Sequence, residues 1–179
     1  MSKKVLVIST SLRTKGNSAA LAAAFAEGAK EAGHAVETVS LAGKKLEFCR
    51  GCFVCQTTQK CVIQDDASLI ARKMLTADVL VFSTPIYYYE MSGQMKTMLD
   101  RANPLFPSDY AFRDVYLLAV AADEDEKAME GAVKGLSGWI ACFPKARLAG
   151  TLFGGGVTNV GDIAGKTVLD AAREMGRKV

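Results

Sequence analysis

Short apolar runs rich in β-branched residues alternate along this chain with segments of helical period. Five runs have the composition of strands, at 5–9, 35–41, 78–83, 115–122 and 146–153. Strands that alternate with helices need crossover connections, which place parallel strands in one sheet covered on both faces. We therefore predict a doubly wound α/β domain of three layers, with five parallel strands and five helices.

The helical segments each have one apolar face, which predicts the buried residues. Asp65 and Asp66 open the second of these helices, and Ser92 caps the third. The predicted buried residues are Leu21, Phe25, Ala29 and Ala32 in the first helix, Leu69, Ile70 and Met74 in the second, Met95, Met98, Leu99 and Ala102 in the third, and Met129, Val133, Leu136 and Ile140 in the fourth; residues 166–179 form a closing helix.

Length and charge limit what the chain can be. Its 179 residues suit one domain, 1–179, and a net charge of +3 with no basic cluster argues against nucleic acid. The apolar runs are shorter than the roughly 20 residues of a membrane span. A strand begins after only four residues, which leaves no room for a secretory signal. We expect a cytoplasmic protein whose thiols stay reduced.

The loop after the first strand, "STSLRTKGNSAAL" (9–21), is rich in hydrogen-bond donors. It has neither the glycine fingerprint of dinucleotide folds nor the GK[ST] of a P-loop. The start of the following helix adds free N–H groups and the positive end of its dipole, which together favour a phosphate dianion. The alternative is that Asn17 or Ser18 is only a helix cap and Arg13 a solvated charge. The side-chain donors are Ser11, Arg13, Thr14, Asn17 and Ser18.

The loop after the third strand begins with Pro85, which we expect to end the strand because proline has no N–H. An apolar and aromatic run follows at the end of the sheet, where a planar heteroaromatic ring could lie against it. The alternative is that some of the tyrosines belong to the core or to a subunit contact. The residues of this run are Ile86, Tyr87, Tyr88 and Tyr89.

Four of the five cysteines have the spacing C-x2-C-x2-C-x5-C, at Cys49, Cys52, Cys55 and Cys61. Compact runs of this type suit 4Fe-4S clusters, whereas zinc sites usually have two separated ligand pairs. The thiols could also simply pack a loop. We predict that Cys142 is a core residue and that His34 is a solvated turn residue. With a single histidine and no GxSxG turn, a Ser-His-Asp hydrolase is disfavoured.

Two of these stretches resemble motifs of the flavodoxin-like NAD(P)H-dependent FMN reductases, a family that includes iron-sulfur flavoproteins. "TSLRTKGNS" (10–18) matches the family's phosphate loop, with Thr10 where glycine is usual. "TPIYYYEMSGQMKTMLDR" (84–101) matches the stretch that contacts the isoalloxazine ring. The resemblance covers nearly the whole chain and implies a flavodoxin-like sheet of order 2-1-3-4-5.

The resemblance further implies noncovalent FMN and NAD(P)H as co-substrate, with hydride transfer at the flavin and no catalytic side chain. The electron acceptor would be a quinone, a flavin, or another small molecule or protein, and the oligomer a homodimer or homotetramer. The loop after the fourth strand departs from the family, because acids stand where Gly or Ser is common. Those acids could simply begin the next helix. The implied FMN contacts are Ser11, Arg13, Gly16, Asn17, Ser18, Pro85, Ile86, Tyr87, Tyr88 and Tyr89, with Ala122 and Asp123 after the fourth strand.

Whether the cysteines hold a 4Fe-4S cluster stays open, because plain FMN reductases have a similar segment. An iron-sulfur flavoprotein that carries electrons between proteins is therefore an alternative to a reductase, and a nonredox phosphate-binding domain is a third. The loop 154–162 is expected near the strand ends, as part of a substrate lid or a subunit contact.

Overall fold

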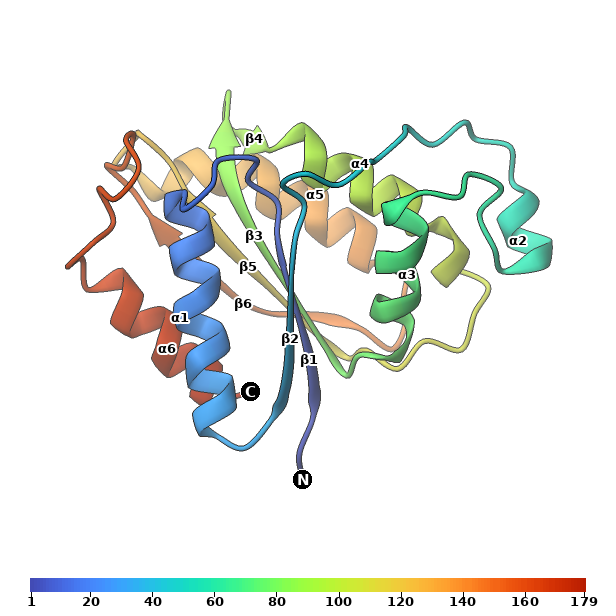
Figure 1. Ribbon diagram of the computed structural model, residues 1–179, viewed down its shortest axis with the longest axis horizontal. Helices are drawn as coiled ribbons and strands as arrows, with labels where there is room; N and C mark the ends of the chain where they lie inside the picture. Colours follow the sequence, from blue (N-terminus) through green and yellow to red (C-terminus); the bar gives the residue numbers. More distant parts are fainter.

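The computed structural model describes residues 1–179, and its strands form one sheet (Figure 1). Five strands are parallel, in the order β2-β1-β3-β5-β6, while β4 pairs antiparallel with the end of β3. The predicted order 2-1-3-4-5 is thus confirmed, with one short strand added that the sequence pattern did not reveal. The strands are β1 Lys4–Ser9, β2 Ala35–Ser40, β3 Val79–Tyr87, β4 Glu90–Met91, β5 Asp114–Val120 and β6 Arg147–Gly154.

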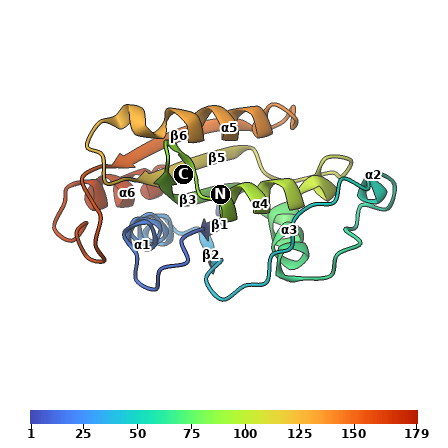
Figure 2. The same cartoon turned by 90° about the horizontal axis from the view of Figure 1, so that it is seen from above.

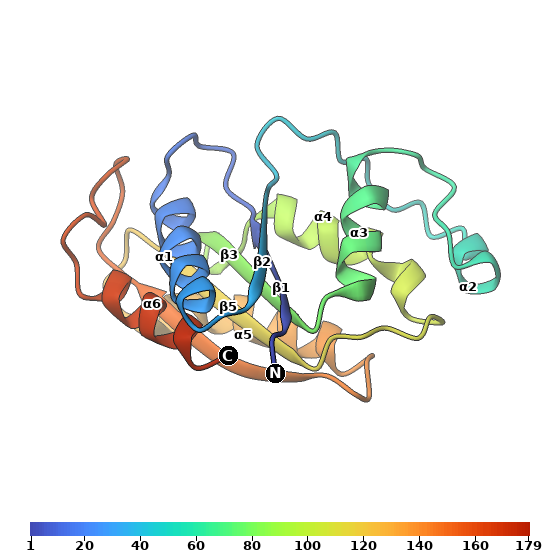
Figure 3. The same ribbon diagram turned by 60° about the horizontal axis from the view of Figure 1, so that its bottom comes forward.

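Helices cover both faces of the sheet, as predicted. Figure 2 shows α1 and α6 on one side of the strands, with α3 and α4 on the other. A sixth helix, α2, lies in the cysteine segment at the edge of the molecule (Figure 3). No helix is both long and apolar enough to cross a membrane. The helices are α1 Asn17–Glu31, α2 Val54–Thr58, α3 Asp66–Thr76, α4 Gly93–Arg101, α5 Glu130–Ile140 and α6 Val168–Arg177, with 3-10 turns η1 Asn103–Leu105 and η2 Glu126–Met129.

Alternating residues of the strands divide the core into two clusters. On β1, Leu6 and Ile8 pack with α3, α4 and α5, whereas Val5 and Val7 pack with α1 and α6. Most of the predicted helix-face residues are buried in one of these clusters. Ala32 is an exception because α1 ends one residue earlier, and Leu69 is exposed because α3 buries Ala67, Ile70, Ala71 and Met74 instead.

β3 continues through Pro85, so the prediction that this residue ends the strand is wrong. Pro85 pairs in register with Val120 of β5. The carbonyl of Ser83 accepts from the N–H of Thr10, so Ser83 faces β1. Two residues later the strand presents the same edge, but β1 has already ended at Ser9. The missing N–H of Pro85 therefore breaks no ladder bond.

Two single-residue predictions were wrong. His34 is half-buried rather than solvated, since its Nδ1 accepts from the N–H of Lys3 (3.1 Å) and its Nε2 lies 3.0 Å from the carbonyl oxygen of Val179. Cys142 is exposed, because α5 ends at Ile140 and Phe143 takes the next buried position. His34 thus joins the two ends of the chain, far from the strand ends that carry the predicted site.

Helices α1 and α6 pack side by side (Figure 3), and two glycines lie at their contact. A Cβ on Gly28 would lie 1.8 Å from the carbonyl oxygen of Arg173, and a Cβ on Gly176 would lie 2.1 Å from that of Phe25. Both neighbours are backbone atoms, which cannot rotate away. The close crossing of these helices therefore depends on the absence of side chains there.

We predict that Gly28→Ala lowers the free energy of unfolding by about 3 kcal/mol, because the helices must separate. The control is Gly138→Ala on α5, where a Cβ meets nothing within 4 Å. That change should raise stability by about 1 kcal/mol through helix propensity. Urea unfolding followed by circular dichroism measures both. Equal stability of Gly28→Ala and the unchanged chain would contradict the packing.

Candidate functional site

The predicted ligand loops meet at one edge of the sheet, at the carboxyl ends of β1, β3 and β5 (Figure 1). This is where parallel α/β sheets bind ligands, since strand order reverses beside β1. Four segments form the edge: the loop 10–16, the turn between β3 and β4, the loop 121–125, and the loop 155–163.

The first turn of α1 has backbone donors without partners. The N–H groups of Asn17, Ser18 and Ala19 donate to no acceptor in the protein, and the helix cap is Gly16, whose position carries no side-chain bond. Ser11 is buried, and its Oγ accepts from the N–H of Arg13, so its hydroxyl proton is free to donate outward. Neither Asn17 nor Ser18 is the helix cap, so that alternative is wrong. The unpaired N–H groups and the Ser11 hydroxyl favour binding of an anion.

Arg13 and Asn17 are engaged with the loop 155–163. Arg13 Nη1 donates to the carbonyl of Thr158 (2.8 Å), and Asn17 Nδ2 donates to that of Asn159 (2.8 Å). Asn17 Oδ1 accepts from the N–H of Gly161 at 3.2 Å. The loop that the sequence placed near the strand ends is thus fastened to the start of α1. Arg13 and Asn17 build the wall of this site, and the sequence did not reveal that role.

Thr10, which departs from the family motif, is fully buried and bonded. Its backbone N–H and its Oγ1 both donate to the carbonyl of Ser83, and its Oγ1 lies 3.1 Å from Ser92 Oγ. Ser92 in turn caps α4 by accepting from the N–H of Met95. The threonine therefore fixes the loop 10–16 to β3 and α4, a contact that glycine lacks.

The turn between β3 and β4 presents aromatic side chains to solvent. Tyr87, Tyr88 and Tyr89 are 48%, 100% and 64% exposed, so none belongs to the core. Tyr88 and Tyr89 both have left-handed backbone, with φ of 50° and 63°. Non-glycine residues in this conformation cost free energy and gather at functional sites. The aromatic platform is thus held in place by a strained turn.

Two neighbours support this turn. The hydroxyl of Tyr89 lies 3.3 Å from Asp123 Oδ2, which joins the turn to the loop after β5. Helix α5 packs against the turn so closely that a Cβ on Gly131 would lie 2.4 Å from the carbonyl oxygen of Tyr89. Gly131 was not among the predicted site residues, and no local pattern in the sequence marks it.

The loop after β5 has Ala122 and Asp123 exposed at the same edge. The carbonyl of Asp123 accepts from the N–H of Gly156, which joins this loop to the loop 155–163. Asp125 caps η2 by accepting from the N–H of Lys127 (3.0 Å). The acidic run therefore begins the next helical turn, as the alternative predicted. Asp123 also contacts two neighbouring segments at the edge, through Gly156 and Tyr89.

The four clustered cysteines line one small hollow together with the end of α4 and η1. Cys49 and Cys52 are exposed, Cys55 is buried and accepts from Asn103 Nδ2 at 3.1 Å, and Cys61 is half-buried. No three His, Cys, Asp or Glu side chains are grouped closely enough to hold a single metal ion. A cluster, whose four ligands attach to separate irons, needs thiols spread around a shared space.

A buried ion pair closes the base of the cysteine segment. Arg101 and Asp65 form two bonds, Nη1 to Oδ2 at 2.6 Å and Nη2 to Oδ1 at 2.8 Å, and both side chains are almost fully buried. Burial alone would raise the pKa of Asp65, but bonds from Arg101 and from the N–H of Glu47 hold it below its ordinary value. The sequence predicted Asp65 as a helix opener, which is confirmed, and missed Arg101.

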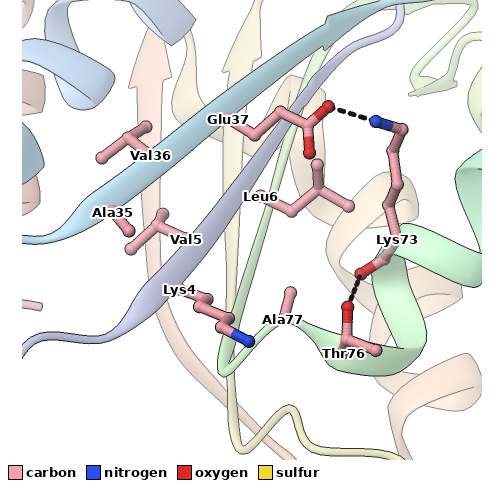
Figure 4. A pocket seen from close by; sticks show the side chains of 9 residues that line it. All are labelled: Lys4, Val5, Leu6, Ala35, Val36, Glu37, Lys73, Thr76 and Ala77. Carbon is pink, nitrogen blue, oxygen red and sulfur yellow. Dashed lines mark hydrogen bonds and ion pairs between the residues drawn. The ribbon is translucent and has the colours of Figure 1, made fainter.

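A hollow of about 320 Å³ lies at the opposite end of the strands, between β1, β2 and α3 (Figure 4). Its walls include Lys4, Leu6 and Ala35, and also Lys73 and Glu37, which form an ion pair with each other. It contains none of the unpaired N–H groups or exposed aromatic residues described above. We therefore place the candidate site at the carboxyl edge.

The donor set fits a phosphorylated planar cofactor. A phosphate needs converging N–H and O–H donors, which the first turn of α1 and Ser11 provide. A planar ring needs an exposed apolar surface beside them, which Ile86 and the tyrosine turn provide. The loops that carry these groups are bonded to one another, so the edge is preformed.

Comparison with known proteins agrees with this geometry. The chain is 39% identical over 102 residues to an iron-sulfur flavoprotein of Methanocaldococcus jannaschii, covering 57% of this chain and 53% of that protein. It is 33% identical over 101 residues to one of Archaeoglobus fulgidus, covering 56% and 46%. The chain thus spans about half the length of the curated relatives it matches.

Among solved structures, the NAD(P)H:quinone oxidoreductase from Methanothermobacter marburgensis superposes with a TM-score of 0.78 at 20% identity, covering 99% of this chain and 96% of that one. This similarity shows the fold. A protein described as a flavodoxin, WrbA-like protein, from Agrobacterium tumefaciens shares that fold with a TM-score of 0.67 at 17% identity, covering 99% of this chain and 95% of that one. The family described as NADPH-dependent FMN reductase matches residues 3–155. Because this match spans most of its length, the chain belongs to the NADPH-dependent FMN reductase family.

Proposed function

We propose that the chain is a single flavodoxin-like domain, 1–179, that binds FMN and acts as an NAD(P)H-dependent oxidoreductase. One observation carries the proposal: three unpaired N–H groups open α1 beside the Ser11 hydroxyl, at the edge that also carries the exposed tyrosine turn. The family to which the chain belongs supports the same cofactor. Bound FMN would supply hydride and electron transfer at its ring.

In this proposal the start of α1 holds the phosphate. The N–H groups of Asn17, Ser18 and Ala19 and the hydroxyl of Ser11 would donate to its oxygens, and the helix dipole would add to the attraction. Gly16 leaves room for the phosphate, since a Cβ there would already lie 3.1 Å from Ser11 Oγ. Ser18 is buried and orients the turn through its carbonyl, which accepts from Ser83 Oγ. Arg13 keeps the neighbouring loop in place.

The ring would lie against the tyrosine turn. Pro85 and Ile86 are half-buried and form an apolar floor, while Tyr87, Tyr88 and Tyr89 form the exposed rim. Ala122 and Asp123 border the opposite side, with Asp123 fixed by Tyr89. No protein nucleophile or base is required, because these residues position the ring and leave one side open to a nicotinamide or an acceptor.

We further propose a small aromatic acceptor, such as a quinone or a flavin, over a protein acceptor. Structures of the same fold include proteins named as an azoreductase from Bacillus anthracis and an NAD(P)H:quinone oxidoreductase, whose names denote small acceptors. The full exposure of Tyr88 also favours a homodimer or homotetramer in which a second copy covers the turn.

A second candidate is an electron carrier that holds a 4Fe-4S cluster beside FMN. The observation that favours it is the shared hollow of Cys49, Cys52, Cys55 and Cys61, and six of the matched relatives are named iron-sulfur flavoproteins. The four thiolates would be the ligands, with Asn103 donating to Cys55. Iron and acid-labile sulfide in protein prepared without oxygen would support this candidate.

The reductase proposal predicts yellow protein whose flavin absorbance bleaches when NADH or NADPH is added without oxygen, and returns when a quinone is added. Stopped-flow absorbance measures the rate with each nucleotide. Flavin-loaded protein that bleaches with neither nucleotide, but is reduced by a ferredoxin, would contradict the reductase and favour the carrier. Protein that takes up no FMN would contradict both.

The support of the tyrosine turn by α5 gives a structural prediction. Gly131→Ala should push the carbonyl of Tyr89 outward and raise the dissociation constant for FMN roughly tenfold, a loss of about 1.4 kcal/mol. Gly138→Ala, on the same helix with open space around it, should leave the constant unchanged. Quenching of flavin fluorescence measures both. Equal binding by the two variants would show that the turn does not hold the ring.

A further inference from the structure

Arg101 is a fully buried charged residue outside the FMN edge. It is the last residue of α4, only 1% exposed, and lies beneath the cysteine segment. A buried guanidinium is costly unless every N–H has an acceptor. The hydrogen-bond acceptors around Arg101 therefore indicate its role.

The two terminal nitrogens of Arg101 connect both flanks of the cysteine segment. Nη1 donates to the carbonyl of Glu47 at 2.7 Å, on the side before Cys49. Nη2 donates to the carbonyl of Ile63 at 3.1 Å, on the side after Cys61. Asp65 accepts from both nitrogens and also from the N–H of Glu47. One side chain thus closes the loop that carries all four thiols.

The remaining donor of Arg101 has no partner. Its Nε is buried and makes no hydrogen bond. Arg101 is also one of the residues that line the hollow shared by Cys49, Cys52, Cys55 and Cys61. The terminal N–H groups of Arg101 are bonded to the loop and to Asp65, while its Nε–H is buried without a partner. A positively charged side chain in the lining of the four-cysteine hollow suits an anionic sulfur group. Hydrogen bonds and positive charge near a cluster raise its reduction potential.

We infer that Arg101 is the positioning residue of the four-cysteine site: it closes the loop and places its positive charge in the lining of the hollow, where it would raise the reduction potential of a bound cluster. Asp65 has the opposite electrostatic effect, because its carboxylate offsets part of the charge. The inference rests on the proposed cluster and is independent of the FMN reductase activity.

The test compares Arg101→Gln with Asp65→Asn. Loss of the positive charge should shift the cluster potential to more negative values, and loss of the negative charge should shift it to more positive values. A purely structural role would disturb the loop in both variants and give no opposite signs. Lys134→Gln on α5, an exposed lysine without an ion pair, is the control for a lost charge and should shift nothing.

The measurement is an anaerobic redox titration of reconstituted protein, with the cluster followed by electron paramagnetic resonance and FMN content by absorbance. Arg101→Lys keeps the charge and should stay closer to the unchanged chain than Arg101→Gln does. If Arg101→Gln does not assemble a cluster, the other two variants test the role of Arg101. Asp65→Asn must then still raise the cluster potential, and Arg101→Lys must lower it slightly.

The outcomes separate the two proposals. An unchanged chain that takes up no iron and sulfide, yet binds FMN, refutes the cluster proposal and the role of Arg101 together. A chain that holds a cluster whose potential is the same in all variants, or moves in the same direction in both Arg101→Gln and Asp65→Asn, refutes the role of Arg101 alone. Opposite shifts support it.

Discussion

The site depends on a single constraint: the N–H groups in the first turn of an α-helix have no hydrogen-bond acceptor within that helix. In this chain Gly16 caps α1 without a side-chain bond, so the donors of Asn17, Ser18 and Ala19 stay unpaired at the edge of the sheet. The parallel sheet decides where they point, because β1 delivers the chain to that edge and α1 returns from it. An anion is the partner that satisfies both the donors and the helix dipole.

The other loops of the edge are bonded to this turn or to one another. Asn17 and Arg13 hold the loop 155–163, the carbonyl of Asp123 holds the same loop from the other side, and the Asp123 side chain holds Tyr89. Tyr88 and Tyr89 have left-handed backbone, and α5 contacts their turn at Gly131, where a Cβ would lie 2.4 Å from the carbonyl oxygen of Tyr89. The result is a preformed edge, in which the loops are bonded before any ligand arrives. Preorganisation of this kind favours tight binding of a flat cofactor.

The sequence predicted the layers and the order of the parallel strands, because hydrophobic period is a local signal. The two loops that it proposed for a ligand lie together at one edge of the sheet. The sequence-based predictions were wrong where contacts between distant segments determine the position of a residue. Pro85 stays within β3 because β1 ends first, and Cys142 is exposed because Phe143 takes the buried position. Arg101 went unnoticed since an arginine at the end of a helix is normally a surface residue, and only the fold buries it against Asp65. The tightly approached Gly131 has no local signal of its own.

The most direct test of the central claim is to compare the binding of FMN with that of riboflavin, which has the same ring and no phosphate. Each charge-assisted hydrogen bond to the phosphate is worth about 1.5–3 kcal/mol. Titration calorimetry should therefore find that FMN binds at least about 100-fold more tightly than riboflavin, a difference of about 2.8 kcal/mol or more. Equal affinities for the two flavins would contradict the account, because the start of α1 would then hold no phosphate.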